Sequence, residues 1–356
     1  MKTFSALFFF FFFFCCPLPA DEGLRIGTTF SRQQCIYLGL DWQETYLAVL
    51  KLKPDIIRLG AYWNEIEAKE STFDLTTLDW EIKEAKKRGI PIVLTIGMKA
   101  PRWPEYFIPA WVFKKTQLHY SDDIAENPVL KKYTLRFIRE VINHYSAEEA
   151  IAYIQVENEA LNKFGKKNWQ LSKKFLSEEI ELIRSLDNLK RPIVLTAATY
   201  PNTFLRTIAR IFTKGDWIKN NLALCDILGI NAYPTIGQKT FGFRHYVRTS
   251  PEQRKKSLRR VLKAAKNKGA ELWVTELQAE PWEPGELVHT KKHAPPSISP
   301  ETVVYYFEEL KTEGVRTVLL WGAEYWFYQK KEHGNLRWWK MAEDMFKSNN
   351  KKSLAE

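Results

Sequence analysis

Short apolar runs alternate along the chain with longer segments in which apolar residues recur every three or four positions. The runs are typical of parallel strands buried on both faces, and the longer segments are typical of amphipathic helices that pack on such strands. The eight predicted strands cover residues 24–28, 56–59, 90–96, 152–156, 193–196, 227–230, 272–275 and 315–320. Because no Pro-, Gly- or Ser-rich linker interrupts the series, the pattern predicts an α/β protein, a single-domain (β/α)8 TIM barrel, rather than an open doubly wound sheet.

The ends of several predicted helices carry residues that usually begin or end helices. The helices are predicted at residues 78–88, 130–144, 171–186, 258–268, 304–313 and 336–346. Gly89 supplies a left-handed residue after the first of them. Ser250-Pro251 and Ser299-Pro300 are a typical N-cap and first-turn pair for the fourth and the fifth.

The first twenty residues differ in composition from the rest of the chain. Met1-Lys2 carries one positive charge, residues 8–14 are all phenylalanine, and Ala20 is a small residue at the end. This arrangement is typical of a secretory signal peptide, and the apolar run is too short to cross a membrane. We therefore expect cleavage after Ala20, a secreted or periplasmic protein without stable membrane insertion, a barrel over residues 21–347 and a polar tail over residues 348–356. Acylation of Cys15 or Cys16 as a lipoprotein anchor is the alternative.

The remaining cysteines bear on disulfide formation, and the net charge bears on the possible binding partners. Cys35 and Cys225 are expected at opposite ends of the barrel, too far apart for a disulfide, so both should be free thiols. The formal net charge is +11, and many lysines fall near helix C-termini, where they suit the helix dipole. A solvated basic surface on a monomer is favoured over nucleic-acid binding, because the chain has no nucleic-acid motif. An anionic glycan or a cell surface stays open as a partner.

Chemically active side chains lie on or directly after five of the predicted strands, at the ends where barrel enzymes carry their active sites. They are Arg58 on the second strand, Asn158 and Glu159 after the fourth, Tyr233 after the sixth, Glu276 after the seventh and Trp321 after the eighth. Two carboxylates at two strand ends are what acid-assisted cleavage of a glycosidic bond requires. A single glutamate at a strand end is usually solvated or ion-paired, so only the combination indicates a catalytic site.

The segments Ile57-Arg58-Leu59-Gly60, Asn158-Glu159, Val274-Thr275-Glu276 and Leu320-Trp321 follow one another over nearly all of the chain. With them the chain resembles the retaining glycoside hydrolases of clan A, and most of all the cellulase-like family five. The resemblance implies that Glu159 is the acid/base and that Glu276 is the nucleophile. We expect Arg58 and Tyr233 to contact Glu276, Asn158 to bind the sugar 2-hydroxyl, and Trp321 to form the floor under the sugar ring.

Four further glutamates near strand ends are weaker candidates. Glu157 lies two residues before Glu159, so we expect it on the same face of the strand, one layer deeper and structural. Glu65 is expected in a loop. Glu280 and Glu324 lie beyond their strands, and we expect them to be solvent-exposed unless they contact substrate.

Other features fit a carbohydrate enzyme without a cofactor. Trp103, Trp282 and Trp326 are candidate sugar-stacking platforms or core residues, and Trp103 is the strongest candidate for an extra subsite. His289 and His293 have i, i+4 spacing but lie among Lys and Pro without an acidic ligand, so we expect no metal. The chain has no phosphate-binding loop, dinucleotide fingerprint or nucleophile elbow, and we expect no cofactor.

These observations predict a secreted retaining β-glycosidase that acts on a β-linked poly- or oligosaccharide of the glucan or mannan type. A carbohydrate-binding barrel without catalysis and a transglycosylase of the same fold are the alternatives. Many family-five members have histidines near strands two, three and six, where this chain has Tyr62-Trp63, Met98-Lys99 and Asn231-Ala232. The exact family and the sugar therefore stay open.

Overall fold

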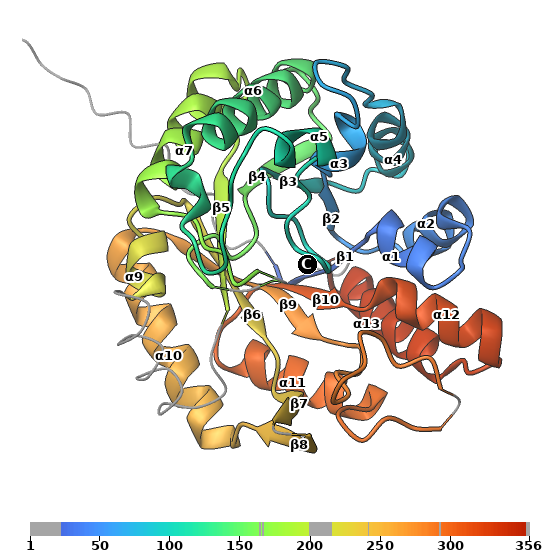
Figure 1. The fold of residues 1–356 in the computed structure, drawn as a ribbon. Helices are drawn as coiled ribbons and strands as arrows, with labels where there is room; N and C mark the ends of the chain where they lie inside the picture. Colours follow the sequence, from blue (N-terminus) through green and yellow to red (C-terminus); the bar gives the residue numbers. More distant parts are fainter. Residues whose placement is uncertain are drawn as a thin grey trace, which may run out of the picture.

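Eight parallel strands form one closed barrel in the computed structural model, which describes residues 23–163, 165, 167–198, 216–240, 242–291 and 293–353. The strands are β1 (Arg25–Thr29), β2 (Ile57–Gly60), β3 (Ile92–Ile96), β4 (Ile151–Val156), β5 (Ile193–Ala198), β6 (Ile227–Ala232), β9 (Glu271–Gln278) and β10 (Thr317–Trp321). They follow one another around the barrel in the order β1-β10-β9-β6-β5-β4-β3-β2 (Figure 1). The predicted (β/α)8 barrel is confirmed. The signal peptide predicted at residues 1–20 lies outside the described residues and stays a prediction.

A ring of helices surrounds the barrel (Figure 1). Its longer members are α2 (Trp42–Lys51), α4 (Thr76–Lys86), α6 (Pro128–His144), α7 (Lys173–Leu186), α10 (Pro251–Lys268), α11 (Pro300–Thr312), α12 (Ala323–His333) and α13 (Arg337–Ser353). The shorter ones are α1 (Arg32–Tyr37), α3 (Trp63–Ile66), α5 (Ala110–Phe113), α9 (Trp217–Asn221) and the 3-10 turn η1 (Ile124–Glu126). Ser250 and Ser299 cap α10 and α11 as predicted, and Gly89 has a φ of +64°. An antiparallel hairpin that the pattern did not predict, β7 (Thr235–Thr240) with β8 (Phe243–Arg248), follows β6.

The last helix is longer than its apolar pattern predicted. The stripe ends at Phe346, but α13 continues to Ser353, so most of the predicted polar tail is helical. Asn349 gives a reason, because its side-chain amide donates to the backbone oxygen of Leu24 at 2.5 Å and to Asp55 Oδ2 at 2.7 Å. These bonds hold α13 against the segments that lead into β1 and β2.

The barrel interior changes from apolar to charged along the strands. A cluster of Ile56, Val93, Val194, Ile227, Trp273 and Leu319 fills one part of it. Arg58 on β2, Gln155 on β4 and Glu276 on β9 are also buried inside the barrel. A charged layer inside a barrel is stable only when its members pair with one another, and these do. The interior therefore presents a built polar site where the βα loops begin.

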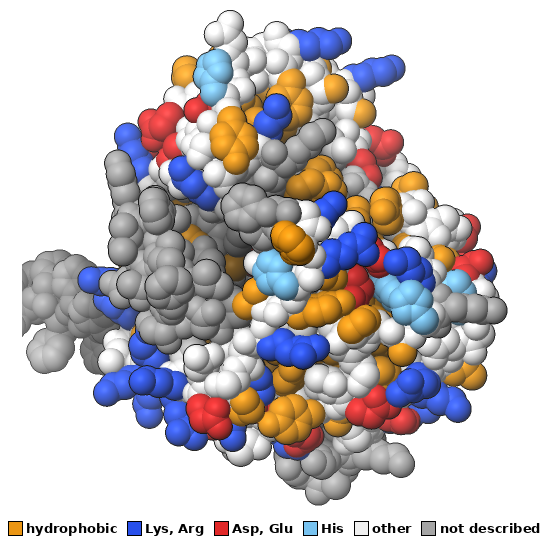
Figure 2. All heavy atoms as spheres, turned by 60° about the horizontal axis from the view of Figure 1, so that its bottom comes forward, with side chains coloured by type: hydrophobic (Ala, Val, Ile, Leu, Met, Phe, Trp, Pro, Cys, Tyr) orange, Lys and Arg blue, Asp and Glu red, His pale blue; other side chains and the backbone are white. Residues whose placement is uncertain are grey.

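The outer surface is rich in positive charge, and Lys and Arg side chains gather on the face that Figure 2 shows. Helix α10 carries exposed basic residues that include Lys256, Arg260 and Lys263. Cys35 and Cys225 are free thiols, as predicted. Within the described part of the chain, no helix has the length and apolar character to span a membrane.

Candidate active site

Glu159 leaves β4 by a strained backbone path. The strand ends at Val156, and both Glu157 and Glu159 have left-handed backbone conformations, with φ of +57° and +48°. Such conformations cost about 1–2 kcal/mol each in residues other than glycine, and they cluster at functional sites. The N–H of Glu159 donates to Thr196 Oγ1 at 2.9 Å, which stabilises the turn. The expectation that Glu157 and Glu159 share one face of a continuing strand is therefore wrong, because the strand stops before either residue.

Glu276 lies within β9 at an irregularity of the sheet. Ile230 pairs with Val274 and Asn231 with Glu276, so Thr275 is the extra residue of a bulge. A bulge re-aims the neighbouring side chain, and bulges are frequent near active sites.

Both oxygens of Glu276 accept a hydrogen bond. Arg58 Nη2 donates to Oε1 at 2.8 Å, and the Tyr233 hydroxyl donates to Oε2 at 2.6 Å. Arg58 is fully buried, and Thr29 Oγ1 and Gln155 Oε1 accept from its other nitrogens at 2.9 and 3.2 Å. A buried guanidinium and a phenol therefore hold the two oxygens of the Glu276 side chain in place. The two contacts expected for Glu276 are present.

Asn231 links Glu159 to Thr275, the residue before Glu276. Its Nδ2 donates to Glu159 Oε1 at 2.6 Å, and its Oδ1 accepts from the hydroxyl of Thr275, the residue before Glu276, at 2.8 Å. Burial, followed by the negative charges of Glu276 and Glu105, raises the pKa of Glu159 to about 8. Glu159 therefore holds its proton at neutral pH and can act as an acid. Sequence reasoning missed the role of Asn231, although it stands at the end of a predicted strand.

Asn158 is held by its oxygen. Oδ1 accepts from Gln155 Nε2 at 3.2 Å and from Thr196 Oγ1 at 3.3 Å. No described residue accepts a hydrogen bond from its Nδ2. The amide therefore has its donor available, as binding of a sugar hydroxyl requires.

An ion pair that the sequence did not predict, between buried Lys99 and partly buried Glu105, lies next to Glu159. Lys99 is fully buried, with Nζ 3.1 Å from the backbone oxygen of Glu159 and 3.4 Å from Glu105 Oε2. Burial raises the pKa of Glu105, and the charge of Lys99 opposes this rise. Lys99 and Glu105 both come from the segment after β3, in which the sequence indicated only Trp103 as a candidate site residue.

Glu157 is structural, and its carboxylate holds that segment. It accepts the backbone N–H groups of Met98 at 2.9 Å and Lys99 at 2.5 Å. Its other contact is the carboxyl group of Glu179 on α7, and burial raises the pKa of both. Among the described residues no N–H group reaches the oxygens of Glu179, so the hydrogen bond between the two acids depends on a shared proton.

Trp321 ends β10 and is buried beside Arg102, another residue of the segment after β3. The Cζ of Arg102 lies 3.9 Å from the centroid of the Trp321 ring. Its two terminal nitrogens bond Glu280 and Glu324, which are 8% and 0% exposed. The expectation of solvent exposure for these two glutamates is wrong, because a buried arginine pairs with both.

The remaining candidate site residues named from the sequence differ in how far they are exposed to solvent. Trp103 and Trp282 are 49% and 41% exposed, and the Trp282 ring lies edge-on to Tyr233 with centroids 5.1 Å apart. Trp326 is fully buried and donates to the backbone oxygen of Ala279, so it belongs to the core. Glu65 lies in the short helix α3 instead of a loop and pairs with Arg32.

Two further features lie outside this site. His289 bonds Glu286 and the backbone oxygen of His293, and no described residues form a group of three or more His, Cys, Asp or Glu placed to hold a metal.

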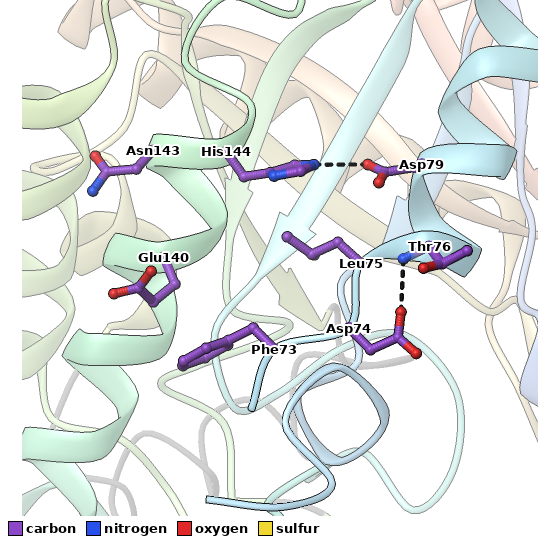
Figure 3. A pocket seen from close by; sticks show the side chains of 8 residues that line it. All are labelled: Phe73, Asp74, Leu75, Thr76, Asp79, Glu140, Asn143 and His144. Atoms are coloured by element: carbon purple, nitrogen blue, oxygen red, sulfur yellow. Dashed lines mark hydrogen bonds and ion pairs between the residues drawn. The ribbon is translucent and has the colours of Figure 1, made fainter. Parts of the chain in front are cut away.

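A hollow of about 430 Å³ opens between α4 and α6 (Figure 3), where His144 and Asp79 pair at 2.9 Å. It is lined by Phe73, Asp74, Leu75, Thr76, Asp79, Glu140, Asn143 and His144, and none of these residues contacts the two glutamates.

One family model matches part of the chain. The model of the glycoside hydrolase 42 family, described as beta-galactosidase, matches residues 40–189, which is less than half of the chain. The match includes Arg58, Asn158 and Glu159 and ends before Glu276. No curated protein matches the chain.

Solved structures of glycoside hydrolases have a similar fold. A beta-galactosidase from Halorubrum lacusprofundi is 14% identical over 83% of this chain and 52% of its own, with a TM-score of 0.56. An exo-beta-1,4-mannosidase from Opitutaceae bacterium strain TAV5 is 14% identical over 84% and 51%, with a TM-score of 0.57. A family-five structure, GH5_18 from Streptomyces cattleya, is 12% identical over 84% and 70%, with a TM-score of 0.56. The chain spans about half the length of the first two, and the resemblance to clan A glycoside hydrolases is confirmed.

Proposed function

We propose that the protein is a secreted retaining β-glycosidase. The observation that carries the proposal is the different surroundings of the two glutamates. Glu276 accepts from Arg58 and Tyr233, whereas Glu159 is buried near that negative charge with a raised pKa. Double displacement needs one carboxyl group that donates a proton and one that attacks as an anion, and the surroundings of Glu159 and Glu276 fit these two roles.

The reaction follows from these states. Glu159 gives its proton to the glycosidic oxygen, and the bond between that oxygen and the anomeric carbon breaks. The carboxylate of Glu276 attacks the same carbon and forms a covalent glycosyl-enzyme. Glu159, now ionised, removes a proton from water, which displaces Glu276 and releases the sugar with its original anomeric configuration. The free Nδ2 of Asn158 is a donor for the sugar 2-hydroxyl, whose hydrogen bonds strengthen in the transition state.

The proposed substrate is a β-linked oligo- or polysaccharide of the glucan or mannan type. The beta-galactosidase family match adds β-galactosides to the substrates that a screen should contain. Export through the predicted signal peptide is part of the proposal and is supported by the composition of residues 1–20.

The test uses a panel of aryl β-glycosides with the variant Glu276→Gly. The variant should lose hydrolysis, and added azide should restore turnover and give a glycosyl azide of inverted configuration. Glu271→Gly is the matched control, because Glu271 begins the same strand, is exposed and should leave activity near that of the unaltered protein. Full activity of Glu276→Gly would remove Glu276 from the mechanism. Oligosaccharide binding without any turnover would instead favour a binding barrel.

A further inference from the structure

A chain of buried polar contacts ties together the segments that follow five neighbouring strands. The Tyr62 hydroxyl bonds Ser31 Oγ at 2.6 Å, and the Ser31 N–H donates to Glu324 Oε1 at 2.5 Å. Glu324 and Glu280 then share the guanidinium of Arg102. These five residues, here called the Arg102 lock, follow β1, β2, β3, β9 and β10. Those strands are consecutive around the barrel.

The lock reaches from one side of the barrel mouth to the other. In the strand order β3 and β9 are four positions apart in either direction, so they lie on opposite sides of the barrel. Arg102 follows β3, yet its partner Glu280 follows β9. The segment after β3 has a strained backbone at the residue that makes this contact, since Arg102 has a φ of +93°. The segments after β9 and β10 pack closely at Gly322 and Glu280. A Cβ at position 322 would lie 2.8 Å from the Cβ of Glu280, so this packing requires glycine.

The position of the lock relative to the two glutamates decides what it blocks. Glu159 follows β4 and protonates the leaving oxygen, so the leaving group departs on the β4 side. The sugar that Glu276 attacks is expected over Trp321, which ends β10 on the side of the barrel opposite β4. Arg102 lies over the Trp321 ring, with Cζ 3.9 Å from its centroid, so the lock borders the place expected for that sugar.

We propose that the Arg102 lock closes the site beyond a single sugar, so that the enzyme removes only terminal sugars from the non-reducing end. This inference rests on the proposed glycosidase function and adds its mode of action. A glycan chain continuing past that sugar would have to pass through the buried pairs of Arg102 with Glu280 and Glu324. Two atoms of the lock, Arg102 Nε and Glu280 Oε2, are buried without a hydrogen-bond partner. A sugar hydroxyl can both donate and accept, so hydroxyls of a terminal sugar would satisfy them.

The decisive experiment compares two forms of one oligosaccharide with the unaltered protein. The aryl β-glycoside that is hydrolysed selects the sugar, and a β-1,4-linked oligosaccharide of that sugar is labelled at its reducing end. One form has a free non-reducing terminus, and the other carries a 4,6-O-ketal there. The free form should shorten one sugar at a time, and the ketal form should react at least 100-fold more slowly.

Cleavage of the ketal form at internal bonds, at a rate similar to that of the free form, would overturn the lock while leaving the glycosidase function intact. If neither aryl glycosides nor oligosaccharides react, the glycosidase function itself is wrong, and the lock has no such role. The two failures are therefore distinguishable.

Variants test whether Arg102 is the blocking residue. Arg102→Ala should raise the ratio of ketal-form to free-form cleavage at least 10-fold. Arg102→Lys keeps the charge but cannot bridge two carboxylates in the same way, so it should raise the ratio less. Arg259→Lys is the control, because Arg259 pairs with Glu313 on the outer helices, and its ratio should not change. Thermal melting confirms that each variant is folded. If Arg102→Lys is folded and its ratio of ketal-form to free-form cleavage is unchanged, Arg102 is not the blocking residue. This outcome can be read even if Arg102→Ala does not fold.

Discussion

The side-chain amide of Asn231 donates to Glu159 at 2.6 Å while its oxygen accepts from the residue before Glu276. One side chain at the end of β6 therefore contacts Glu159 and the residue that precedes Glu276. Because Nδ2 occupies Oε1 of Glu159, the other oxygen is left to carry the proton that the reaction transfers. The arrangement makes Asn231 a positioning residue for the proton donor.

Asn231→Ala should impair substrates that need a proton donor more than those that do not. A hydrogen bond to a charged or proton-transferring group contributes about 1.5–3 kcal/mol, which corresponds to roughly 10- to 100-fold in rate. We expect that loss in kcat/KM for alkyl glycosides and a much smaller loss for dinitrophenyl glycosides, whose leaving group departs without protonation. Steady-state kinetics with both substrates measure the difference. Equal losses for the two would show that Asn231 does not act through Glu159.

The pH dependence should respond to Lys99 and Glu105 in opposite directions. Catalysis needs protonated Glu159, so activity should fall as pH rises through its pKa of about 8. The charge of Lys99 lowers that pKa and the charge of Glu105 raises it. Lys99→Met should therefore move the alkaline limb of kcat/KM upward, and Glu105→Gln should move it downward, each by roughly 1 pH unit or less. Shifts in the same direction would contradict this electrostatic account.

The acid pair of Glu157 and Glu179 should make the fold less stable at alkaline pH. Burial raises the pKa of Glu179 in the folded state, so the folded protein holds a proton that the unfolded chain releases above the ordinary carboxyl range. Stability is therefore present at low pH and is lost as pH rises, by at most about 1.4 kcal/mol per unit for one group.

Glu179→Gln should reduce this loss, because an amide donates to Glu157 without a titrating proton. Urea unfolding at pH 5, 7 and 9 measures the slope of the unfolding free energy with pH. Glu181→Gln, an exposed position on the same helix, should keep the slope of the unaltered protein. The raised pKa of Glu159 also lowers the unfolding free energy as pH rises, and it does so in all three proteins. An unchanged slope in Glu179→Gln would exclude the shared proton.

Gly97 should be the glycine least tolerant of substitution near the site. It has a φ of +130°, and a Cβ there would lie 2.4 Å from the carboxyl group of Glu157. Gly97→Ala should cost about 3 kcal/mol or more in unfolding free energy, since it combines backbone strain with a buried clash. It should also lower activity, because Glu157 holds the backbone of Met98 and Lys99.

Gly89→Ala is the matched control. Gly89 has a φ of +64°, but the space that a methyl group would occupy there is open, so only about 1 kcal/mol of backbone strain is expected. Chemical denaturation of both variants gives the comparison. Similar losses would mean that the contact with Glu157 is not what requires glycine at position 97.

The sequence alone determined the barrel and the two glutamates. Strand and helix periodicity, the glycine after each repeat and the Ser-Pro helix starts are local signals, and every predicted strand is present. Parallel strands bring their carboxyl ends to one face, so Arg58, Asn158, Glu159, Tyr233, Glu276 and Trp321 could be grouped before any contact was known. The catalytic roles assigned to them remain predictions.

Only the tertiary structure decided which side chains surround that group. Arg102 meets Glu280 and Glu324 across 178 and 222 positions of sequence, and Lys99 meets Glu159 across 60. These pairings depend on the path of the segment after β3, which has no regular period. A glutamate beyond a strand end is solvated by default, and it is buried here because folding places a cation next to it. Periodicity predicts which residues face a core, but it does not predict which charges compensate one another inside it.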